Sequence, residues 1–463
     1  MTTMASGRAA ARPGTLLVVG SGSAMPHHRE RRADHEGRER LLRSLPAAAR
    51  VLGWQDAHDT SGALREAYRN AYPRCEWQSF DGVHALHATT GPFDLIVLDQ
   101  GLIPFSDPAE ALRLMRQRAG PETVLAMLQP QDTSLAMLQR WVEADLTDSD
   151  DGPLARQDWR LRSLASATKL MMDAGWMPTL MDACHEAPRQ DAFAQQALAL
   201  AAAAGVPAAT AWRQWRMRSG VVHACAPFET PACTAGARAS LAVVVPTTRD
   251  AQLRVNVECS PGLHELNARV LSVRGATDPA DALERAAAQV KEDWVLLCHQ
   301  DVYFARGFGT RLAALLAGID AIQRRRTLIG FAGIGVNPKT HAYEHAGFVI
   351  DRTQRFDNPA SEHAVSIDEL ALVLPRESLL SIDPALGWHL WATDLCLQAI
   401  CTHKFFPRIV RAPLFHNSHS DHQLPTAFHE SAVRLRAKYP DFGPIHTLCG
   451  VIGSGTAPQG PTT

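Results

Sequence analysis

Short apolar runs that stop at Gly, Pro or Asp alternate with helical patterns in two separate stretches of this sequence. In the first stretch the apolar runs are Arg50–Leu52, Phe93–Leu98 and Thr123–Leu128. The helical patterns Ser61–Ala71 and Pro108–Arg118 separate them. Strand-like runs joined by helices are typical of parallel sheets whose faces are covered by helices. The first stretch is therefore predicted to fold as an α/β domain.

The second stretch repeats the same alternation. It opens with the apolar run Leu241–Pro246, which the proline ends, and continues with the run Arg269–Val273. The helical pattern Asp278–Gln289 follows, and then the run Trp294–Cys298. Runs of this length, rich in Val and Leu, indicate strands that are buried on both faces. We therefore predict an α/β fold with two Rossmann-like domains, each built on a parallel sheet.

The length and local composition set the expected boundaries of these domains. A chain of 463 residues is long enough for two or three domains with cores of their own. We expect a flexible segment over 1–40, a first domain over 41–226, a linker over 227–239, a second domain over 240–450 and a disordered tail over 451–463. The linker and tail are rich in small and polar residues and lack helical periodicity.

Charge and cysteine content argue against several classes of function. The 46 Lys and Arg residues oppose 48 Asp and Glu residues, so the net charge is −2, whereas nucleic-acid binding needs a basic surface. Nine cysteines, an odd number without regular spacing, do not indicate a disulfide framework. The Ala-rich stretch Ala197–Ala211 contains a proline and is too short to span a bilayer. We expect a cytoplasmic protein with no transmembrane segment and no nucleic-acid partner.

The most informative segment is a buried strand that ends in polar residues. The apolar run Trp294–Leu297 leads directly to His299, Gln300 and Asp301. In open α/β sheets, ligands bind at the carboxyl ends of the strands. A carboxylate there can hold a divalent cation against a diphosphate. The alternative is that Asp301 is a solvated turn residue after a buried strand.

Two later segments carry further candidates. Asp394 comes directly before the apolar positions Leu395, Leu397 and Ile400 of a helical pattern, and the dipole of such a helix would stabilise its charge. A plain helix cap is one role for an acid at this place. His416, His419 and His422 lie within seven residues of one another and could bind a metal or a diphosphate. The alternative is an exposed polar loop.

The order of these motifs resembles the family-2 glycosyltransferases of the GT-A fold over approximately Ser240 to Lys438. His299-Gln300-Asp301 stands where that family has its Asp-x-Asp metal motif. Phe331–Val336 is similar to the strand and Gly turn that follow the motif. Ser366–Arg376 is similar to the family's acceptor-side strand, and Ile382–Ala399 is similar to the segment that holds its catalytic base.

This resemblance implies specific roles. Asp301 and His416 would hold Mn²⁺ or Mg²⁺, and His419 is a second candidate. The sugar-nucleotide donor would contact four residues at the strand ends, namely Pro246, His299, Gln300 and Asp301. Four residues would line the acceptor side, namely Asp368, Glu369, Trp388 and His389. Asp394 would be the catalytic base, with Asp368, Glu369 or His389 as the alternatives.

The first half resembles a class I S-adenosylmethionine-dependent methyltransferase. The approach to the first strand is Arg43–Gly53, and Phe93–Pro108 is similar to that family's fourth strand and its turn. However, the Gly-x-Gly turn that lets the backbone approach the cofactor is missing, because Trp54 and Gln55 follow Gly53. Asp81 is a loose match for the acid that holds the ribose. We expect this domain to keep the fold without methyl transfer and to serve as a scaffold or docking domain.

Together these features predict a metal-dependent glycosyltransferase that moves a sugar from a nucleoside-diphosphate donor to an acceptor hydroxyl. Its substrates would be a nucleotide sugar and a carbohydrate or other hydroxyl acceptor, and a protein partner could dock on the N-terminal domain. Two alternatives stay open. One is a methyltransferase with a sugar-binding appendage, and the other is a non-catalytic scaffold or binding protein.

Overall fold

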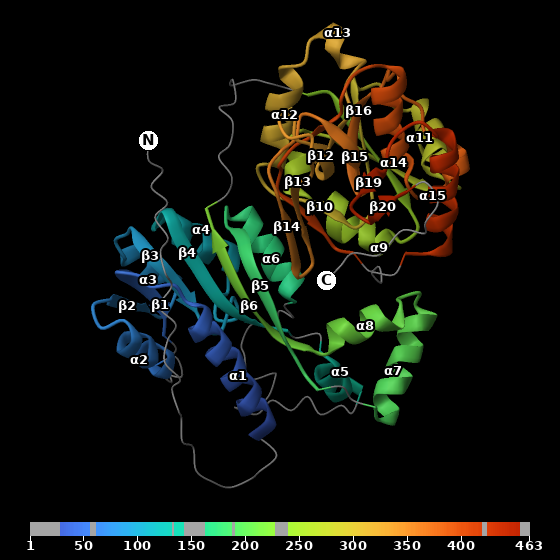
Figure 1. Cartoon of the computed structure of the whole chain (residues 1–463). Helices are drawn as coiled ribbons and strands as arrows, with labels where there is room; N and C mark the ends of the chain where they lie inside the picture. Colours follow the sequence, from blue (N-terminus) through green and yellow to red (C-terminus); the bar gives the residue numbers. More distant parts are fainter. Residues whose placement is uncertain are drawn as a thin grey trace.

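Two α/β domains lie side by side in the computed structural model (Figure 1). The structure describes residues 28–55, 62–131, 134–142, 163–187, 190–226, 239–418 and 424–453. Both predicted sheet domains are present, so the fold class is α/β as predicted. The predicted linker, apart from residue 239, lies outside the described residues. Among the described residues, no helix combines the length and apolarity needed to cross a bilayer.

The N-terminal domain is built on one six-stranded sheet with the order β2-β1-β3-β4-β6-β5. Its strands are β1 (Arg50–Trp54), β2 (Glu76–Phe80), β3 (Phe93–Leu98), β4 (Ala119–Pro130), β5 (Met177–His185) and β6 (Met217–Cys225). The four strands β2, β1, β3 and β4 are parallel, and β6 runs antiparallel to both β4 and β5. This is a Rossmann-like sheet that ends in an antiparallel pair, the methyltransferase-like fold predicted for this half.

Helices cover both faces of this sheet (Figure 1). The helices of this domain are α1 (His28–Ser44), α2 (Gly62–Ala71), α3 (Val83–Ala88), α4 (Pro108–Gln117), α5 (Leu135–Val142), α6 (Leu164–Asp173), α7 (Ala192–Ala203) and α8 (Ala208–Trp215). Of these, α5, α7 and α8 pack on one another in a separate hydrophobic cluster beside the sheet. Helix α4 begins at Pro108 because the Asp107 side chain accepts a hydrogen bond from the Glu110 N–H. Helix α6 begins with a capping box between Ser163 and Ser166. Local capping therefore explains where both helices begin.

Helix α1 differs from the prediction. Residues 28–40 were expected to be flexible, yet they belong to this 17-residue helix. Leu41 and Leu45 are buried against the sheet, and the Ser44 hydroxyl lies 2.9 Å from His223 Nε2 on β6. The many charged residues of this segment hide these few buried contacts at the sequence level, because only the last turns of the helix are apolar.

The first sheet of the C-terminal domain has the order β17-β11-β16-β9-β7-β8. Its strands are β7 (Leu241–Thr247), β8 (Arg269–Arg274), β9 (Trp294–Cys298), β11 (Ile329–Gly330), β16 (Ala371–Pro375) and β17 (Arg408–Ile409). Strands β8, β7 and β9 are parallel. Along β7, Val243 and Val245 pack into the core on one face, while Ala242 and Val244 pack into the core on the other. Burial on both faces explains the unbroken apolar run in the sequence.

A second sheet lies beyond it, with the order β10-β18-β13-β12-β15 and with β14 paired to β13. Its strands are β10 (Val302–Phe304), β12 (Ala332–Val336), β13 (Tyr343–Asp351), β14 (Gln354–Asp357), β15 (Ala364–Ile367) and β18 (Leu414–His416), while β19 (Ile445–Thr447) and β20 (Gly450–Ile452) form a separate hairpin. The segment Ser366–Arg376 was predicted to contain a strand that begins at an acidic pair, and β16 does follow Asp368 and Glu369. The first residues of the segment belong to β15 in the other sheet, and between the two strands the Asp368 carboxylate accepts the Leu370 N–H.

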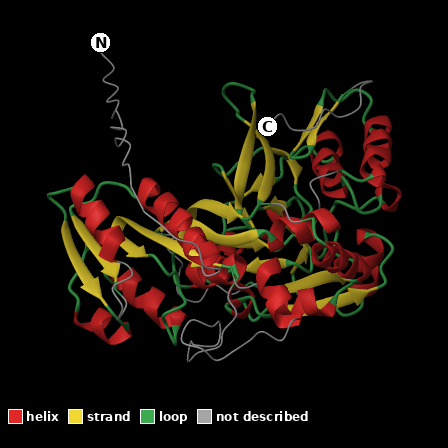
Figure 2. Ribbon diagram, turned by 90° about the horizontal axis from the view of Figure 1, so that it is seen from below, coloured by secondary structure: helices red, strands yellow, loops and turns green. Residues whose placement is uncertain are grey.

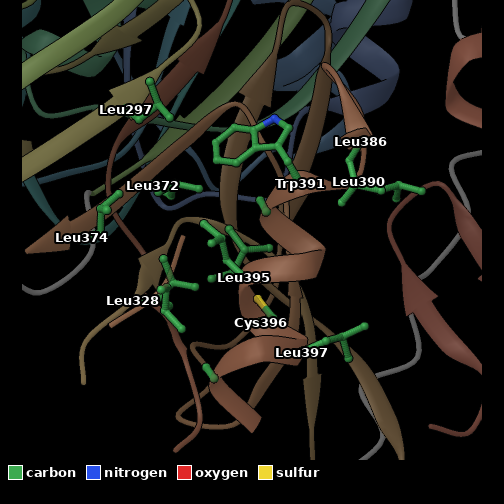
Figure 3. Close-up of a cluster of buried hydrophobic side chains, with 14 of the residues drawn as sticks. Leu297, Leu328, Leu372, Leu374, Leu386, Leu390, Trp391, Leu395, Cys396 and Leu397 are labelled. Atoms are coloured by element: carbon green, nitrogen blue, oxygen red, sulfur yellow. The ribbon is translucent and has the colours of Figure 1, made fainter. Parts of the chain in front are cut away.

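Helical segments cover the C-terminal sheets (Figure 2). They are α9 (Asp250–Leu253), η1 (Arg254–Glu258), α10 (Pro261–His264), α11 (Pro279–Ala287), α12 (Phe308–Ala317), α13 (Ala321–Arg324), η2 (Pro384–Leu386), α14 (Trp391–Leu397), η3 (Gln398–Thr402) and α15 (Thr426–Lys438). Figure 3 shows α14 inserting Trp391, Leu395 and Cys396 into the core beside β9 and β16. Burial raises the pKa of the Cys298 and Cys396 thiols, so both cysteines act as small core residues, as expected.

The two domains share a hydrophobic cluster. Met172 of α6 and Met177 of β5 pack with Tyr303, Phe348 and Phe415 of the C-terminal domain. Polar bonds surround the cluster. The Asp173 carboxylate accepts hydrogen bonds from the Tyr303 hydroxyl at 2.5 Å and from the Arg306 N–H at 3.1 Å. Lys169 Nζ donates to the Val255 carbonyl at 2.9 Å and to Asn256 Oδ1 at 2.6 Å. The N-terminal domain is therefore joined to the C-terminal domain through a buried interface.

Candidate functional site

Strand register brings the site together. Strand β18 lies between β10 and β13, with His416 opposite Val302 on one side and beside Asp351 on the other. Asp301 immediately precedes Val302, and its carbonyl accepts the Asn417 N–H at 2.8 Å. The His299–Asp301 turn at the carboxyl end of β9 therefore meets the end of β18, although more than a hundred residues separate them in the sequence.

His299, Asp301 and His416 form a cluster that could hold a metal ion. One ligand atom from each residue lies within 4.8 Å of the other two. His416 Nε2 is 3.4 Å from Asp301 Oδ1, and the ring centroids of His299 and His416 are 5.9 Å apart. His416 Nε2 is buried, and no described residue forms a hydrogen bond with it. Two imidazoles and a carboxylate that converge on one point are a donor set for a divalent cation.

The charges in this cluster are coupled. Burial would lower the pKa of His416, but the carboxylates of Asp301 and Asp351 raise it to about 10. Burial would raise the pKa of Asp301, but the imidazoles of His416 and His299 hold it well below its usual range. His299 is accessible to solvent, yet protein atoms surround it closely enough to lower its pKa by desolvation. Without a cation, a proton on His416 therefore offsets part of the negative charge of the two carboxylates.

Asp351 is a member of the site that the sequence analysis missed. It is the last residue of β13, and its Oδ2 lies 3.6 Å from His416 Nδ1. A carboxylate beside the second ring nitrogen fixes the orientation of an imidazole that binds a metal through the first. The signal that could have revealed it is the one used for Asp301, an apolar strand that ends in an acid. His419 and His422 lie outside the described residues.

Gln300 and Pro246 were predicted to contact the donor. The Gln300 side chain accepts the N–H groups of Thr248 and Arg249 at 2.9 and 2.8 Å and donates to Thr248 Oγ1 at 2.9 Å. These bonds join the end of β9 to the loop that follows Pro246 in β7. Gln300 therefore positions the loop through its hydrogen bonds, and the two predicted residues do lie at one sheet edge.

The predicted acceptor-side acids lie beside the cluster. Asp368 and Glu369 form the turn between β15 and β16, next to Leu370, whose carbonyl accepts the His299 N–H at 2.9 Å. Burial and the neighbouring Asp368 carboxylate raise the pKa of Glu369 to about 8, although the backbone N–H groups at 390–392 favour its charged form. No described residue forms a hydrogen bond with Glu369 Oε1.

The two predicted aromatic residues precede α14. Trp388 is 41% exposed, so its indole ring is available for stacking on a ligand. His389 is half-buried, and its pKa is lowered by desolvation and then by the nearby His299 ring. An imidazole with a lowered pKa is neutral near pH 7 and can accept a proton.

Asp394 has a different environment from the one predicted. It lies in the first turn of α14, but the N-cap residue is Leu390, so Asp394 is not the cap. Its side chain is fully buried at 0% exposure. Oδ1 accepts the Tyr439 hydroxyl at 2.7 Å, and Oδ2 accepts Gln398 Nε2 at 2.7 Å and Lys438 Nζ at 2.9 Å. This network joins α14 to α15, and the role of Asp394 as the base stays a prediction.

The corresponding sheet edge of the N-terminal domain is filled by aromatic rings. Trp54, the last residue of β1, makes edge contacts with Phe80 at 5.5 Å and with Phe105 at 5.2 Å between ring centroids. All three side chains are buried. Asp81 is exposed and directly follows β2, where an acid that holds a ribose is expected. The turn 56–61 after β1 lies outside the described residues.

No protein-family model matches the sequence, and no curated protein matches it. Solved structures similar to the chain include a complex of the Haloferax volcanii Trm112 methyltransferase activator with a methyltransferase, at 13% identity and a TM-score of 0.29 over 44% of this chain and 93% of that chain. A SAM-dependent methyltransferase from Thermotoga maritima matches at 12% identity and a TM-score of 0.27 over 43% and 91%. A structure of GalNAc-T7 with UDP, GalNAc and Mn²⁺ matches at 11% identity and a TM-score of 0.28 over 43% and 48%.

Methyltransferases are the more frequent class among these similar structures. Similarity at this level of identity and TM-score assigns no activity to the chain. The chemistry must therefore be argued from the site.

Proposed function

We propose that the protein is a metal-dependent glycosyltransferase that uses a nucleoside-diphosphate sugar. The observation that carries the proposal is the cluster of His299, Asp301 and His416 at the carboxyl end of β9. The parallel strands β8, β7 and β9 end at this edge, which is where nucleotides bind in open α/β sheets. A bound divalent cation would neutralise the charge that develops on the diphosphate leaving group.

The donor set fits Mn²⁺ better than Mg²⁺. Mg²⁺ prefers oxygen ligands in near-ideal octahedral geometry, whereas first-row transition metals accept imidazole nitrogen as well. The buried His416 Nε2, which has no hydrogen-bond partner among the described residues, is the atom that a cation would satisfy. Asp351 would orient His416 through the second ring nitrogen.

The residues around the cluster then have distinct tasks. Gln300 holds the loop after β7 against the end of β9, which shapes the edge where the nucleotide would lie. His389 is our candidate for the residue that accepts the proton of the acceptor hydroxyl, because its lowered pKa keeps it neutral at pH 7 and its ring is half-buried near His299. Trp388 would stack on a sugar ring.

The test is nucleotide-sugar hydrolysis by the full-length protein with UDP-, GDP- and dTDP-linked donors, with Mn²⁺, Mg²⁺ or EDTA. We expect turnover of one donor class that EDTA abolishes and Mn²⁺ restores better than Mg²⁺ does. Absence of both hydrolysis and calorimetric binding for every donor in the presence of Mn²⁺ contradicts the proposal.

Methyl transfer is the second candidate, and the strand order of the N-terminal sheet together with Asp81 after β2 favours it. The rings of Trp54, Phe80 and Phe105 oppose it, because they fill the edge where S-adenosylmethionine would bind. We expect no binding of S-adenosylmethionine at micromolar concentrations. A saturable calorimetric titration with a stoichiometry near one establishes the second candidate instead.

A further inference from the structure

A cavity of about 580 Å³, with both apolar and charged side chains on its walls, lies between the two domains. The N-terminal domain lines it with residues of α6 and α8, among them Lys169 and Arg213. The C-terminal domain lines it with the turn between β13 and β14, which contains Arg352, and with the segment after β18. Neither domain forms this cavity alone. In Figure 1 the helices α6 and α8 lie on the side of the N-terminal domain that faces the C-terminal domain.

Three cationic side chains line the cavity. Burial of Lys169 and, to a smaller extent, the nearby Arg352 guanidinium lower the pKa of Lys169 to about 8. The pKa of Arg352 is lowered by burial and by the positive charge of Arg213 across the domain boundary. Asp351 and His185 are the other titratable residues on the walls, and the pKa of His185 is lowered by desolvation, so it adds no charge near pH 7. On the cavity walls one carboxylate therefore faces three cations, and the carboxylates of Asp173 and Asp301 act on Lys169 and Arg352 from beside the cavity.

The cations are held in place by bonds to the protein. Lys169 Nζ donates to Val255 and Asn256 of the C-terminal domain, and the ammonium lies over the rings of Tyr303 and Phe415. The Arg352 guanidinium donates to the carbonyls of Ser418 and Asn417. Like charges that are fixed at close range in a partly buried space repel one another, and a bound anion relieves that repulsion.

The cavity adjoins the metal cluster. Asp351 lies on the cavity wall and also contacts His416 Nδ1 at 3.6 Å. Asn417, another wall residue, follows His416 directly and donates its N–H to the Asp301 carbonyl. A ligand in the cavity would therefore lie beside the residues that would hold the cation.

We propose that this cavity binds a phosphate-bearing part of a substrate and that the N-terminal domain supplies one positively charged wall of it through Lys169 and Arg213. The assignment to a substrate rests on the proposed glycosyltransferase function. Binding of the anion itself does not depend on that function. The phosphate could belong to the nucleoside-diphosphate donor or to a phosphorylated acceptor, because the same guanidinium and ammonium groups recognise both.

The first experiment tests the anion site alone. Inorganic pyrophosphate is titrated calorimetrically into the full-length protein in EDTA, and the titration is repeated with Arg213→Gln and Arg213→Glu. Arg213 is exposed on α8, so these variants keep the fold, and thermal melting checks this. We expect Arg213→Gln to weaken binding about tenfold and Arg213→Glu to weaken it further. Arg113→Glu, on the exposed side of α4, is the matched control and should bind like the wild type.

The second experiment separates the two sources of the phosphate. UDP or GDP is titrated in Mn²⁺, and pyrophosphate is then titrated into protein saturated with the nucleotide. If Arg213→Gln weakens nucleotide binding and the saturated protein no longer binds pyrophosphate, the cavity holds the donor. If nucleotide binding is unchanged and pyrophosphate still binds, the cavity holds a phosphorylated acceptor. Should no nucleotide bind at all, the glycosyltransferase proposal fails while the pyrophosphate result still stands. Pyrophosphate binding that is absent in the wild type, or equal in wild type and Arg213→Glu, overturns the cavity proposal.

Discussion

The His416 ring lies between two carboxylates, that of Asp301 in the turn after β9 and that of Asp351 at the end of β13. Asp301 and Asp351 both lie within 3.6 Å of its ring nitrogens. An imidazole between two acids is either protonated or bound to a cation, because the site otherwise carries uncompensated negative charge. The proposed metal binding at this residue would therefore exchange a proton for a divalent ion.

The Asp301→Asn variant tests the metal site. The substitution preserves shape but removes the charge that a hard cation needs, so we expect the Mn²⁺ dependence of UDP or GDP binding to disappear. Calorimetry with and without Mn²⁺ measures this. Asp293→Asn is a suitable control, since Asp293 is exposed and precedes the same strand. Retention of the full Mn²⁺ dependence in Asp301→Asn would make Asp301 a simple turn residue.

The raised pKa of Glu369 predicts that the stability of the folded protein depends on pH. Its folded-state pKa of about 8 lies above the ordinary value of 4.5, so the protonated form is favoured in the folded protein. Its contribution to stability is therefore fully present below pH 4.5 and is lost as the pH rises through about 8. Glu369→Gln cannot ionise, so its melting temperature should fall less than that of the wild type between these pH values. If the melting temperatures of the two proteins change with pH in the same way, Glu369 does not titrate in this range.

At the scale of elements, Asp394 joins two helices. Lys438 Nζ of α15 lies 2.9 Å from the fully buried Asp394 carboxylate of α14, and it also contacts Asp383 at 2.9 Å. The two residues are 44 positions apart, so the ion pair is a direct bond between elements that are distant in sequence. Loss of this ion pair should lower the stability of the fold more directly than it lowers turnover.

The Asp394→Asn variant distinguishes this role from that of a base. The substitution removes the buried carboxylate from Lys438, which keeps only Asp383 as an acidic partner. We expect a loss of about 2–4 kcal/mol in the free energy of unfolding, allowing for the partial exposure of Lys438. The double variant Asp394→Asn/Lys438→Met should recover part of that loss. Urea unfolding measures both. If Asp394→Asn keeps the stability of the wild type while its turnover falls by about 10²–10⁴-fold, Asp394 is the base.

At the scale of the whole molecule, the buried interface should make the two domains unfold together. Met172 is 2% exposed and lies in the cluster shared with Tyr303, Phe348 and Phe415. A charge placed there without a partner is costly to bury, so Met172→Asp should split one calorimetric transition into two or lower its midpoint strongly. Val433→Asp is the control, because Val433 is exposed on α15. Two separate transitions in the wild type indicate that the interface contributes little to stability.

The packing of the two domains against each other explains why the sequence does not reveal the cavity. Lys169, Arg213 and Arg352 lie in three separate segments, and none belongs to a recognisable motif. Their charges meet only because α6 and α8 dock on the β13–β14 turn. Through this interface the N-terminal domain supplies charged side chains to the proposed site. A domain that served only as a separate scaffold would not do so.

The sequence by itself determined the local elements. Side-chain alternation along continuous backbone predicted β3 and β9 with their observed bounds, and it predicted that His299, Gln300 and Asp301 follow a buried strand. These features depend on neighbours in the chain, so their residues carry the signal. The charged helix α1 was missed because its buried residues are few.

Only the tertiary structure decided which side chains meet. Strand register placed Asp351 beside His416, the docking of α15 on α14 enclosed Asp394, and the docking of the two domains formed the cavity around Arg213. In each case the partners are far apart in the sequence. Their contact depends on how whole elements pack, and no local pattern of hydrophobicity or charge records that arrangement.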